Sequence, residues 1–375
     1  MRSPTTAEKP RIPWARPSLV GREREYVVDA LDSTWISGGP YVERLERELP
    51  ARMGARHGVA VNNGTTALQL ALMAVGIGPG DQVIVPGFTF VAAANMVLAV
   101  GATPVQADVD PDTWLLDPES FRAAITPATR AVIPVHLYGN VADMDAIGGI
   151  ARDHGMFVIE DAAEAAFSTH RGRCAGTLGT IGTLSFQATK TLATGEGGMV
   201  LTEDAELDRR MRLLRDHGMR RGRRYWHDVV GYNFRLTNLQ AAVGCAQIEQ
   251  IEGLCRERRR VHETYRRCLA DDPRFRPQRF ADEVSPVLWT FGVRLLPRAD
   301  LPARDVVMAR LLERGIETRP GFHALSDMPP YAGPSLPVAS QVSRNVILLP
   351  AYPALDDATI AFICEAFTST LAPSG

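Results

Sequence analysis

The sequence predicts an α/β protein with a large domain, in which helices flank a mostly parallel sheet, and a smaller α+β C-terminal domain. Short apolar runs alternate with helical patterns from about residue 59 to 202. A long helical pattern follows at 237–270, and strand and helix patterns are mixed after it. Such alternation indicates βαβ units, whose functional groups gather at the carboxyl ends of the strands.

The first domain contains six apolar runs that read as strands and three helical patterns between them. A further strand, turn and helix start are expected in HGVAVNNGTTALQLAL. The other strands are DQVIVP (81–86), ATPVQADV (102–109), RAVIPVHLYG (130–139), MFVIEDAA (156–163), TLSFQ (183–187) and GGMVLT (197–202). The helices are VAAANMVLAVG (91–101), one opened by Asp117 and Pro118, and MDAIGGIARDHG (144–155).

The remaining chain divides into an arm and a second domain. Residues 1–20 are polar and rich in proline, which predicts a flexible N-terminal arm. The pattern at 237–270 contains no proline and predicts one long helix leading out of the large domain. Beyond it, 287–296 predicts a strand, and 305–315 and 356–367 predict helices. The expected divisions are 1–20, 21–250 and 251–375.

Composition and charge exclude several classes of function. The 375 residues carry a formal net charge of -2, so the overall balance favours neither nucleic acid nor an anionic membrane surface as a partner. The five cysteines are widely spaced and form no C-x-x-C pair, which argues against a disulfide framework or a structural zinc site. We therefore expect a cytoplasmic protein that binds no metal and lies outside the membrane.

Lys190 is conspicuous because the chain otherwise builds its positive charge from arginine. Lysine and arginine total 41, and only Lys9 and Lys190 are lysines. Lys190 follows an apolar strand and precedes the glycine-rich GEGG, which makes a plain surface lysine less convincing. A lysine amine can lose its proton and attack an aldehyde, whereas a guanidinium stays charged. Lys190 is thus a candidate for a Schiff base with pyridoxal phosphate.

The other contacts that pyridoxal phosphate needs also have candidates. Asp161, at the end of an apolar strand, could hold a proton on the pyridine nitrogen or cap a helix. One of Phe88 and Phe90 could stack on the ring, although core packing is the default for phenylalanine. Backbone N–H groups free at the expected helix start suit a phosphate, and so does a nearby hydroxyl; a plain helix cap is the alternative. These phosphate candidates are Gly64, Thr65, Thr66 and Ser185.

The motifs together resemble the DegT/DnrJ/EryC1/StrS family of sugar aminotransferases, over nearly the whole chain. The matching runs are NNGTTALQLAL, VPGFTFVAAAN, PVHLYGN, VIEDAAEA, SFQATK with GEGG, and GYNFRLTNLQAAVGCAQ. The resemblance implies the fold type I architecture of pyridoxal-phosphate enzymes. It implies that Lys190 bonds to the cofactor, Asp161 contacts the pyridine nitrogen, Phe90 stacks on the ring, and Thr65, Thr66 and Ser185 bind the phosphate. It also implies a homodimer in which Asn233 completes the site of the other subunit.

Glu164 departs from the family pattern, because many members have glutamine or histidine near the cofactor's phenolic oxygen. A carboxylate there needs a compensating proton or charge. The run EDAAEA resembles the branch that aminates C4 of GDP-4-keto-6-deoxymannose to GDP-perosamine, with glutamate as donor. ETRPGFHALSDMPPY resembles the same branch and places Arg319, His323 and Tyr331 as candidates to face the substrate or to serve the structure.

Three rival functions remain open at this point. The runs SFQ (185–187) and WISGG (35–39) also resemble those of enzymes that aminate a cyclitol ketone or C3 of a sugar. A sugar dehydratase of similar fold has histidine in place of the lysine, so Lys190 argues against that class. A regulatory protein could bind the cofactor without transferring an amino group.

Overall fold

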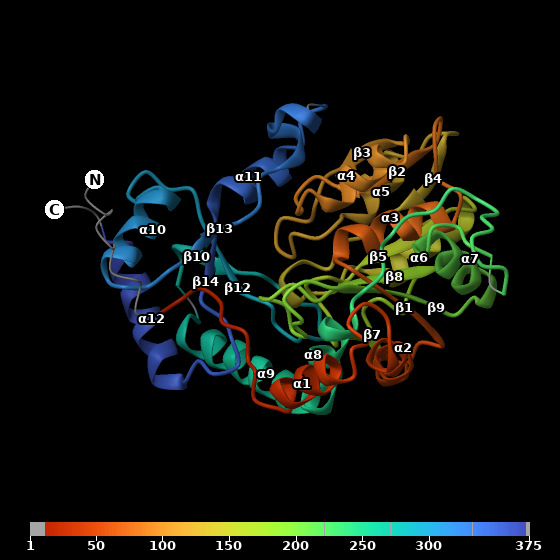
Figure 1. The fold of residues 1–375 in the computed structure, drawn as a ribbon. Helices are drawn as coiled ribbons and strands as arrows, with labels where there is room; N and C mark the ends of the chain where they lie inside the picture. The colour runs from red at the N-terminus through yellow and green to blue at the C-terminus, as the bar shows by residue number, and fades with distance from the viewer. Residues whose placement is uncertain (1–11, 221, 271, 332, 373–375) are drawn as a thin grey trace, which may run out of the picture.

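A seven-stranded sheet lies at the centre of the large domain (Figure 1). The computed structural model describes residues 12–220, 222–270, 272–331 and 333–372. The strand order is β1-β9-β8-β5-β4-β2-β3, and only β9 runs against its neighbours. The prediction of a mostly parallel sheet is therefore confirmed. The strands are β1 (His57–Val61), β2 (Gln82–Pro86), β3 (Thr103–Ala107), β4 (Thr129–Val132), β5 (Phe157–Asp161), β8 (Ile181–Ser185) and β9 (Gly198–Thr202).

Helices surround this sheet, and polar caps set where several of them begin. The side chains of Asn63, Asp117, Asp143 and Asp204 each accept a hydrogen bond from a backbone N–H of the first turn. The helices are α1 (Glu23–Asp32), α2 (Pro40–Met53), α3 (Gly64–Ala74), α4 (Ala92–Ala99), α5 (Pro118–Ala123), η1 (Leu137–Gly139), α6 (Met144–Asp153), α7 (Ala205–Arg215) and α8 (Asn238–Glu249).

A second, four-stranded antiparallel sheet forms the smaller domain, which lies to the left in Figure 1. Its order is β10-β12-β14-β13. A short three-stranded sheet, β11-β6-β7, joins residues of both halves. The remaining elements are β6 (Thr169–His170), β7 (Arg173–Cys174), α9 (Ile251–Cys268), β10 (Phe275–Pro277), β11 (Val284–Ser285), β12 (Phe291–Leu295), α10 (Arg304–Glu313), β13 (Arg319–Pro320), η2 (Leu325–Asp327), η3 (Pro329–Tyr331), α11 (Pro337–Asn345), β14 (Val346–Leu349) and α12 (Asp357–Thr370).

The prediction of one long helix at 237–270 is wrong, because the segment breaks at Gln250 between α8 and α9. Gln250 has φ −104° and ψ 3°, outside the helical region. Most of α8 is buried in the large domain, whereas α9 buries a single stripe that includes Leu254 and Val261. The break lets each helix bury its own apolar surface, and it coincides with the expected domain boundary, which stays a prediction.

The N-terminal segment is attached to the smaller domain, so the expectation of a flexible arm is wrong for Ile12 to Trp14. Ile12 N–H donates to the Gly315 carbonyl at 3.0 Å, and Glu317 N–H donates to the Ile12 carbonyl at 3.0 Å. Trp14 N–H donates to Glu317 Oε2 at 3.1 Å. From there the segment passes along the molecule to α1 (Figure 1). Residues 1–11 of the predicted arm lie outside the described residues.

Neither a membrane span nor a metal cluster is found in the described part of the chain. None of its helices is both long enough and apolar enough to cross a bilayer. Its histidine, cysteine, aspartate and glutamate side chains form no group of three or more placed to hold a metal ion.

Candidate active site

A cavity of about 460 Å³ opens at the carboxyl ends of the parallel strands. Most of the cofactor-binding residues expected from the sequence line it: Gly64, Thr65, Phe90, Asp161, Glu164, Ser185 and Lys190. The remaining lining residues are Trp14, Asn63, Leu68, Ala92, Val135, Ala163, Gln187, Thr189, Glu196, Trp289 and Phe322. Segments that are far apart in sequence therefore meet at one edge of the sheet.

Lys190 is an interior side chain, with 13% of its surface exposed. Lys190 lies in the loop between β8 and β9. Its backbone N–H donates to the Gln187 carbonyl at 2.8 Å. The loop returns through Gly195, whose φ of +87° favours glycine. At Gly198 a Cβ would lie 2.7 Å from the carbonyl oxygens of Asn63 and Leu184. These glycines let the loop close tightly around the lysine.

Asp161 is the last residue of β5 and is buried, with 6% exposure. The residues after it form turns and not a helix, so the helix-cap interpretation is wrong. Its Oδ1 accepts a hydrogen bond from Ala163 N–H at 3.1 Å. Burial raises the pKa of Asp161, while the Ala163 N–H and the charges of Lys190 and His136 oppose that rise. A cationic group in the cavity would stabilise this carboxylate further.

Glu164 is also buried, and it has two hydrogen-bond donors. Lys190 Nζ donates to its Oε1 at 3.2 Å, and Tyr138 N–H donates to its Oε2 at 3.1 Å. Burial raises the pKa of Glu164, and the charge of Lys190 is the largest influence in the opposite direction. The compensation that a carboxylate at this position requires is therefore supplied by the ammonium group of Lys190.

The start of α3 forms a cradle beside Ser185. The N–H groups of Gly64 and Thr65, the first two residues of the helix, have no acceptor within it. A Cβ at Gly64 would lie 2.7 Å from Ser185 Cβ, so glycine allows the helix to approach β8 closely. The expectation that the Thr66 N–H is free is wrong, because it donates to Asn63 Oδ1 at 2.8 Å. Phosphate binding by these residues stays a prediction.

The two phenylalanines after β2 have different environments. Phe88 is fully buried in the core, whereas Phe90 is 51% exposed and lines the cavity. Phe90 also contacts Phe322, with 5.6 Å between the ring centroids. Of the two, Phe90 is therefore the one available to stack on a ligand.

A neighbouring cavity of about 380 Å³ shares Trp14, Phe90, Trp289 and Phe322 with the first. Arg319 and His323 line this neighbouring cavity, and a role for them in facing the substrate stays a prediction. Tyr331 lines neither cavity. Its hydroxyl donates to Asn95 Oδ1 on α4, so the expectation that it faces the substrate is not supported by this arrangement.

Asn233 lies outside the catalytic cavity of its own chain. It is exposed, and its backbone pairs with Asp216 in an antiparallel bridge. The nearby Tyr225 and Val230 are 76% and 82% exposed, an unusual state for large apolar side chains.

Sequence reasoning missed Trp14, Trp289 and Phe322. Trp289 lies in an apolar run that predicted only a strand, and β12 begins two residues after it. The tryptophan in an otherwise polar N-terminal segment was the one local signal for Trp14.

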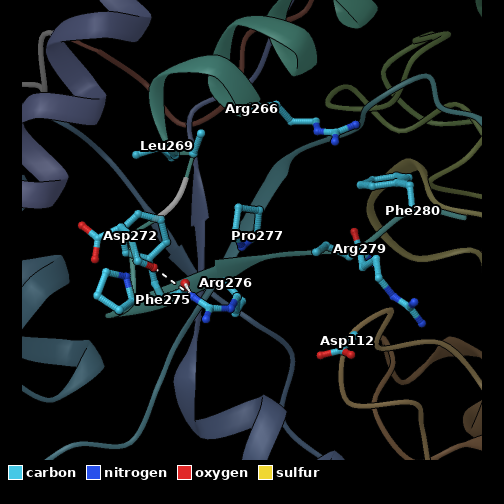
Figure 2. A pocket seen from close by; sticks show the side chains of 12 residues that line it. Asp112, Arg266, Leu269, Asp272, Phe275, Arg276, Pro277, Arg279 and Phe280 are labelled. Carbon is cyan, nitrogen blue, oxygen red and sulfur yellow. Dashed lines mark hydrogen bonds between the residues drawn. The ribbon is translucent and has the colours of Figure 1, made fainter.

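A separate cavity of about 720 Å³ is lined by residues from the end of α9 and from β10 and its flanks, together with Asp112 (Figure 2). Its lining contains no lysine and none of the predicted site residues. The guanidinium groups of Arg266, Arg276 and Arg279 lie apart instead of converging on one point (Figure 2). The residues predicted for the site therefore gather in the cavity around Lys190 and not in this one.

Comparison with known proteins agrees with this site. A model of the DegT/DnrJ/EryC1/StrS aminotransferase family matches residues 17–368. The chain belongs to this family. GDP-perosamine synthase of Caulobacter vibrioides is 45% identical over 370 residues, covering 97% of this chain and 100% of that protein. The chain is an aminotransferase of fold type I.

Two solved structures of the same architecture are similar over almost the full chain. The X-ray structure of S. venezuelae DesV in complex with a ketimine intermediate has a TM-score of 0.88 and 38% identity, covering 93% of this chain and 94% of that one. The PLP form of Spr1654 from Streptococcus pneumoniae has a TM-score of 0.90 and 28% identity, covering 96% and 98%. Pyridoxal 5′-phosphate is the cofactor of this aminotransferase family.

The donor set around the cavity fits that cofactor. It combines a lysine amine, a buried carboxylate at a strand end, an exposed aromatic ring and the free N–H groups of a helix start. The space that the missing Cβ of Gly64 leaves beside Ser185 suits a phosphate.

Proposed function

We propose that the protein transfers the amino group of glutamate to C4 of GDP-4-keto-6-deoxymannose and so makes GDP-perosamine in the cytoplasm. The observation that carries the proposal is the position of the Lys190 amine, enclosed beside two buried carboxylates at the strand ends. The similarity to GDP-perosamine synthase over the full chain supports the choice of substrate.

Each residue of the cavity has one task in this reaction. When bound, pyridoxal phosphate supplies an aldehyde that condenses with amines and a ring that accepts the electrons of a carbanion. Lys190 holds the cofactor covalently and, once displaced, moves the proton at the reacting carbon. Asp161 keeps a proton on the pyridine nitrogen, and Phe90 covers the ring face. Gly64, Thr65 and Ser185 bind the phosphate, whereas the N–H and hydroxyl of Thr66 donate to Asn63 and Asn62. Glu164 lies near the phenolic oxygen.

The aromatic wall between the two cavities supports a 6-deoxy sugar as substrate. Trp14, Phe90, Trp289 and Phe322 present ring surfaces to both spaces. A methyl group packs on such a wall at no penalty, whereas a hydroxymethyl group would lose hydrogen bonds to water. Arg319 and His323 border the second cavity and are placed to meet polar parts of the sugar nucleotide.

The active form is proposed to be a homodimer in which Asn233 completes the phosphate site of the other subunit. Its exposure and its absence from the cavity of its own chain support this assignment. The exposed side chains of Tyr225 and Val230 in the same region support an interface there.

The deciding experiment incubates the holoenzyme with glutamate and a panel of acceptors. The panel contains GDP-, dTDP- and UDP-linked 4-keto-6-deoxy sugars, a 3-keto sugar nucleotide and an inosose, and products are identified by mass spectrometry and NMR. We expect amination of the GDP-linked sugar at C4 with the highest kcat/KM. Preferred amination of the inosose or at C3 would refute the substrate assignment.

The same experiment separates an enzyme from a regulatory protein that only binds the cofactor. Glutamate alone should bleach the absorbance of the lysine-bound cofactor and release one equivalent of 2-oxoglutarate. The Lys190→Arg variant is the matched control, because it keeps the charge but cannot form the covalent link. An unchanged spectrum in the wild-type protein would favour the regulatory alternative.

A further inference from the structure

The amine of Lys190 lies in a defined site made by two side chains from different parts of the chain. Its Nζ is 3.2 Å from Glu164 Oε1 and 3.6 Å from the ring centroid of Trp289. Glu164 and Lys190 are 6% and 13% exposed, so little water competes for the ammonium. A cation held over an indole face is bound more strongly when it is desolvated. We call Glu164 and the ring of Trp289 the amine site.

The ring of Trp289 is fixed from several directions. Its Nε1–H donates to the Thr189 carbonyl at 3.1 Å and to Thr189 Oγ1 at 3.2 Å. Tyr138 stacks on it, with 6.1 Å between ring centroids and 23° between planes. Trp14 packs edge-on against it at 5.3 Å. The indole face is therefore held in place for the amine.

The carboxylate of Glu164 is oriented by an unusual backbone. Tyr138, whose N–H donates to Oε2, has φ 62° and ψ 16°, the left-handed region that a bulky residue seldom adopts. Tyr138 is fully buried, and Gly139 follows it at φ +101°. The strained turn directs one N–H at Glu164 and leaves Oε1 for the amine.

Arg258 on α9 links the backbone at Trp289 to the backbone of the loop that carries Lys190. Its guanidinium donates to the carbonyls of Leu288 and Trp289, at 2.8 and 3.3 Å, on one side. On the other side it donates to the carbonyls of Thr189 and Lys190, at 3.5 and 3.3 Å. Arg258 is 4% exposed, and no carboxylate among the described residues forms an ion pair with it.

Placing this guanidinium in the interior has a physical cost. Burial lowers the pKa of Arg258 to about 10, which shows that the fold disfavours its charge. A residue whose only task was stability would be better replaced by an apolar side chain. Its four acceptors all belong to the backbone around Lys190 and Trp289, which indicates a positional role.

We infer that Glu164 and Trp289 receive the amine of Lys190 as an ammonium whenever it is not joined to the cofactor, and that Arg258 is the residue that positions this amine site. The inference rests on the proposed role of Lys190. When the free amine takes a proton from the reacting carbon, nitrogen gains the positive charge and the electron pair of the broken C–H bond stays with the carbon. The cofactor, when bound, would supply the acceptor for that pair. The amine site stabilises that ammonium, and return of the proton to carbon leaves the amine neutral.

The small number of lysines makes this site directly measurable. In a Lys9→Arg background, Lys190 carries the only lysine amine of the chain. The protein is loaded with pyridoxamine phosphate, which leaves Lys190 free, and is treated with acetic anhydride between about pH 7 and 11.5, a range that includes the ordinary pKa of a lysine amine. Mass spectrometry of the Lys190 peptide gives the acylation rate, and the N-terminal amine is the internal reference. Only the neutral amine reacts, so the amine site should slow acylation.

The variants separate charge stabilisation from simple access. Trp289→Leu should acylate about tenfold faster at pH 8, and its pH of half-maximal rate should fall by about one unit. Trp289→Phe, which keeps a ring, should stay within about threefold of the background protein. Glu164→Gln should shift the pH of half-maximal rate in the same direction as Trp289→Leu. The charged groups that face the amine are Glu164 and Asp161.

Arg258 is tested by the same acylation measurement. Arg258→Met should behave like Trp289→Leu, and Arg258→Lys should restore part of the protection because it can still donate to the carbonyls. An equal acylation rate in Trp289→Leu and the background protein at about pH 8 would overturn the proposal. So would a rate ratio between the two proteins that is as large at the highest pH, where both amines are mostly neutral, as it is at about pH 8. If Trp289→Leu does not fold, Glu164→Gln and Trp289→Phe decide the question. No sugar or glutamate is used, so failure here and failure of the proposed function are distinguishable.

Discussion

Mixing two inactive variants tests whether each active site is shared between subunits. Lys190→Arg removes the amine, and Asn233→Asp places a carboxylate where the phosphate is expected. Because Asn233 lies outside the cavity of its own chain, a hybrid dimer of the two variants should contain one fully native site. Random reassociation of equal amounts makes about half of the dimers hybrid, so activity should recover to about 25% of wild type.

The assay measures glutamate-dependent amination after the mixed variants are dissociated in mild denaturant and reassociated. The control is the double variant mixed equally with wild type. If the site is shared, both sites of each hybrid dimer are inactive, so about 25% of the activity of an all-wild-type sample remains. If each chain forms its own site, about 50% remains. Mixed single variants that stay inactive, together with 50% in the control, would refute the shared site.

Three further predictions follow from single side chains. Lys190→Arg should abolish turnover, and borohydride treatment should then add no cofactor mass to the peptide; any retained turnover would contradict the role of the amine. Asp161→Asn should lower kcat by at least about a hundredfold while cofactor still binds, because a neutral amide cannot hold the pyridine proton; a change below tenfold would contradict that role. His262, buried, has its pKa lowered from 6.5 to about 4, so the unfolded chain is protonated first as pH falls. As the pH falls from about 7 to 5, protonation of His262 in the unfolded chain should lower the unfolding free energy of the wild-type protein by about 2 kcal/mol. The His262→Phe variant should not show this loss when unfolding is measured in urea. Equal losses in the two proteins would contradict this assignment.

The sequence was sufficient to predict the central strands because buried parallel strands are continuous apolar runs bounded by turn residues. The run containing Asp161 became β5, and the one containing Ser185 became β8. Local patterns do not encode strand order, so nothing in GGMVLT indicated that β9 would run antiparallel between β1 and β8. The break at Gln250 was missed for a related reason, since it depends on which surfaces α8 and α9 bury.

Site residues were predictable where their chemistry is rare and their place in a βαβ unit is fixed. Lys190 stood out because the chain has only two lysines and this one follows an apolar strand, and Asp161 stood out because it ends such a strand. Trp289 and Arg258 did not, because a tryptophan in an apolar run and an arginine in a glutamate-rich helix are typical of core and solvated surface. Only packing shows that Arg258 faces inward, with its donors at four carbonyls.

The position of Arg258 ties the chemistry to the arrangement of the two domains. α9 starts where the helical segment breaks, and Arg258 on it binds carbonyls beside Lys190 and beside Trp289. The ring of Trp289 also contacts Phe322 of the smaller domain and Trp14, whose segment is attached to that domain. Thr189 and Tyr138 hold the indole ring itself, so Arg258 acts on the backbone at Trp289 and at Lys190. Removal of the Arg258 guanidinium should therefore loosen both backbone segments at once and slow proton transfer by Lys190.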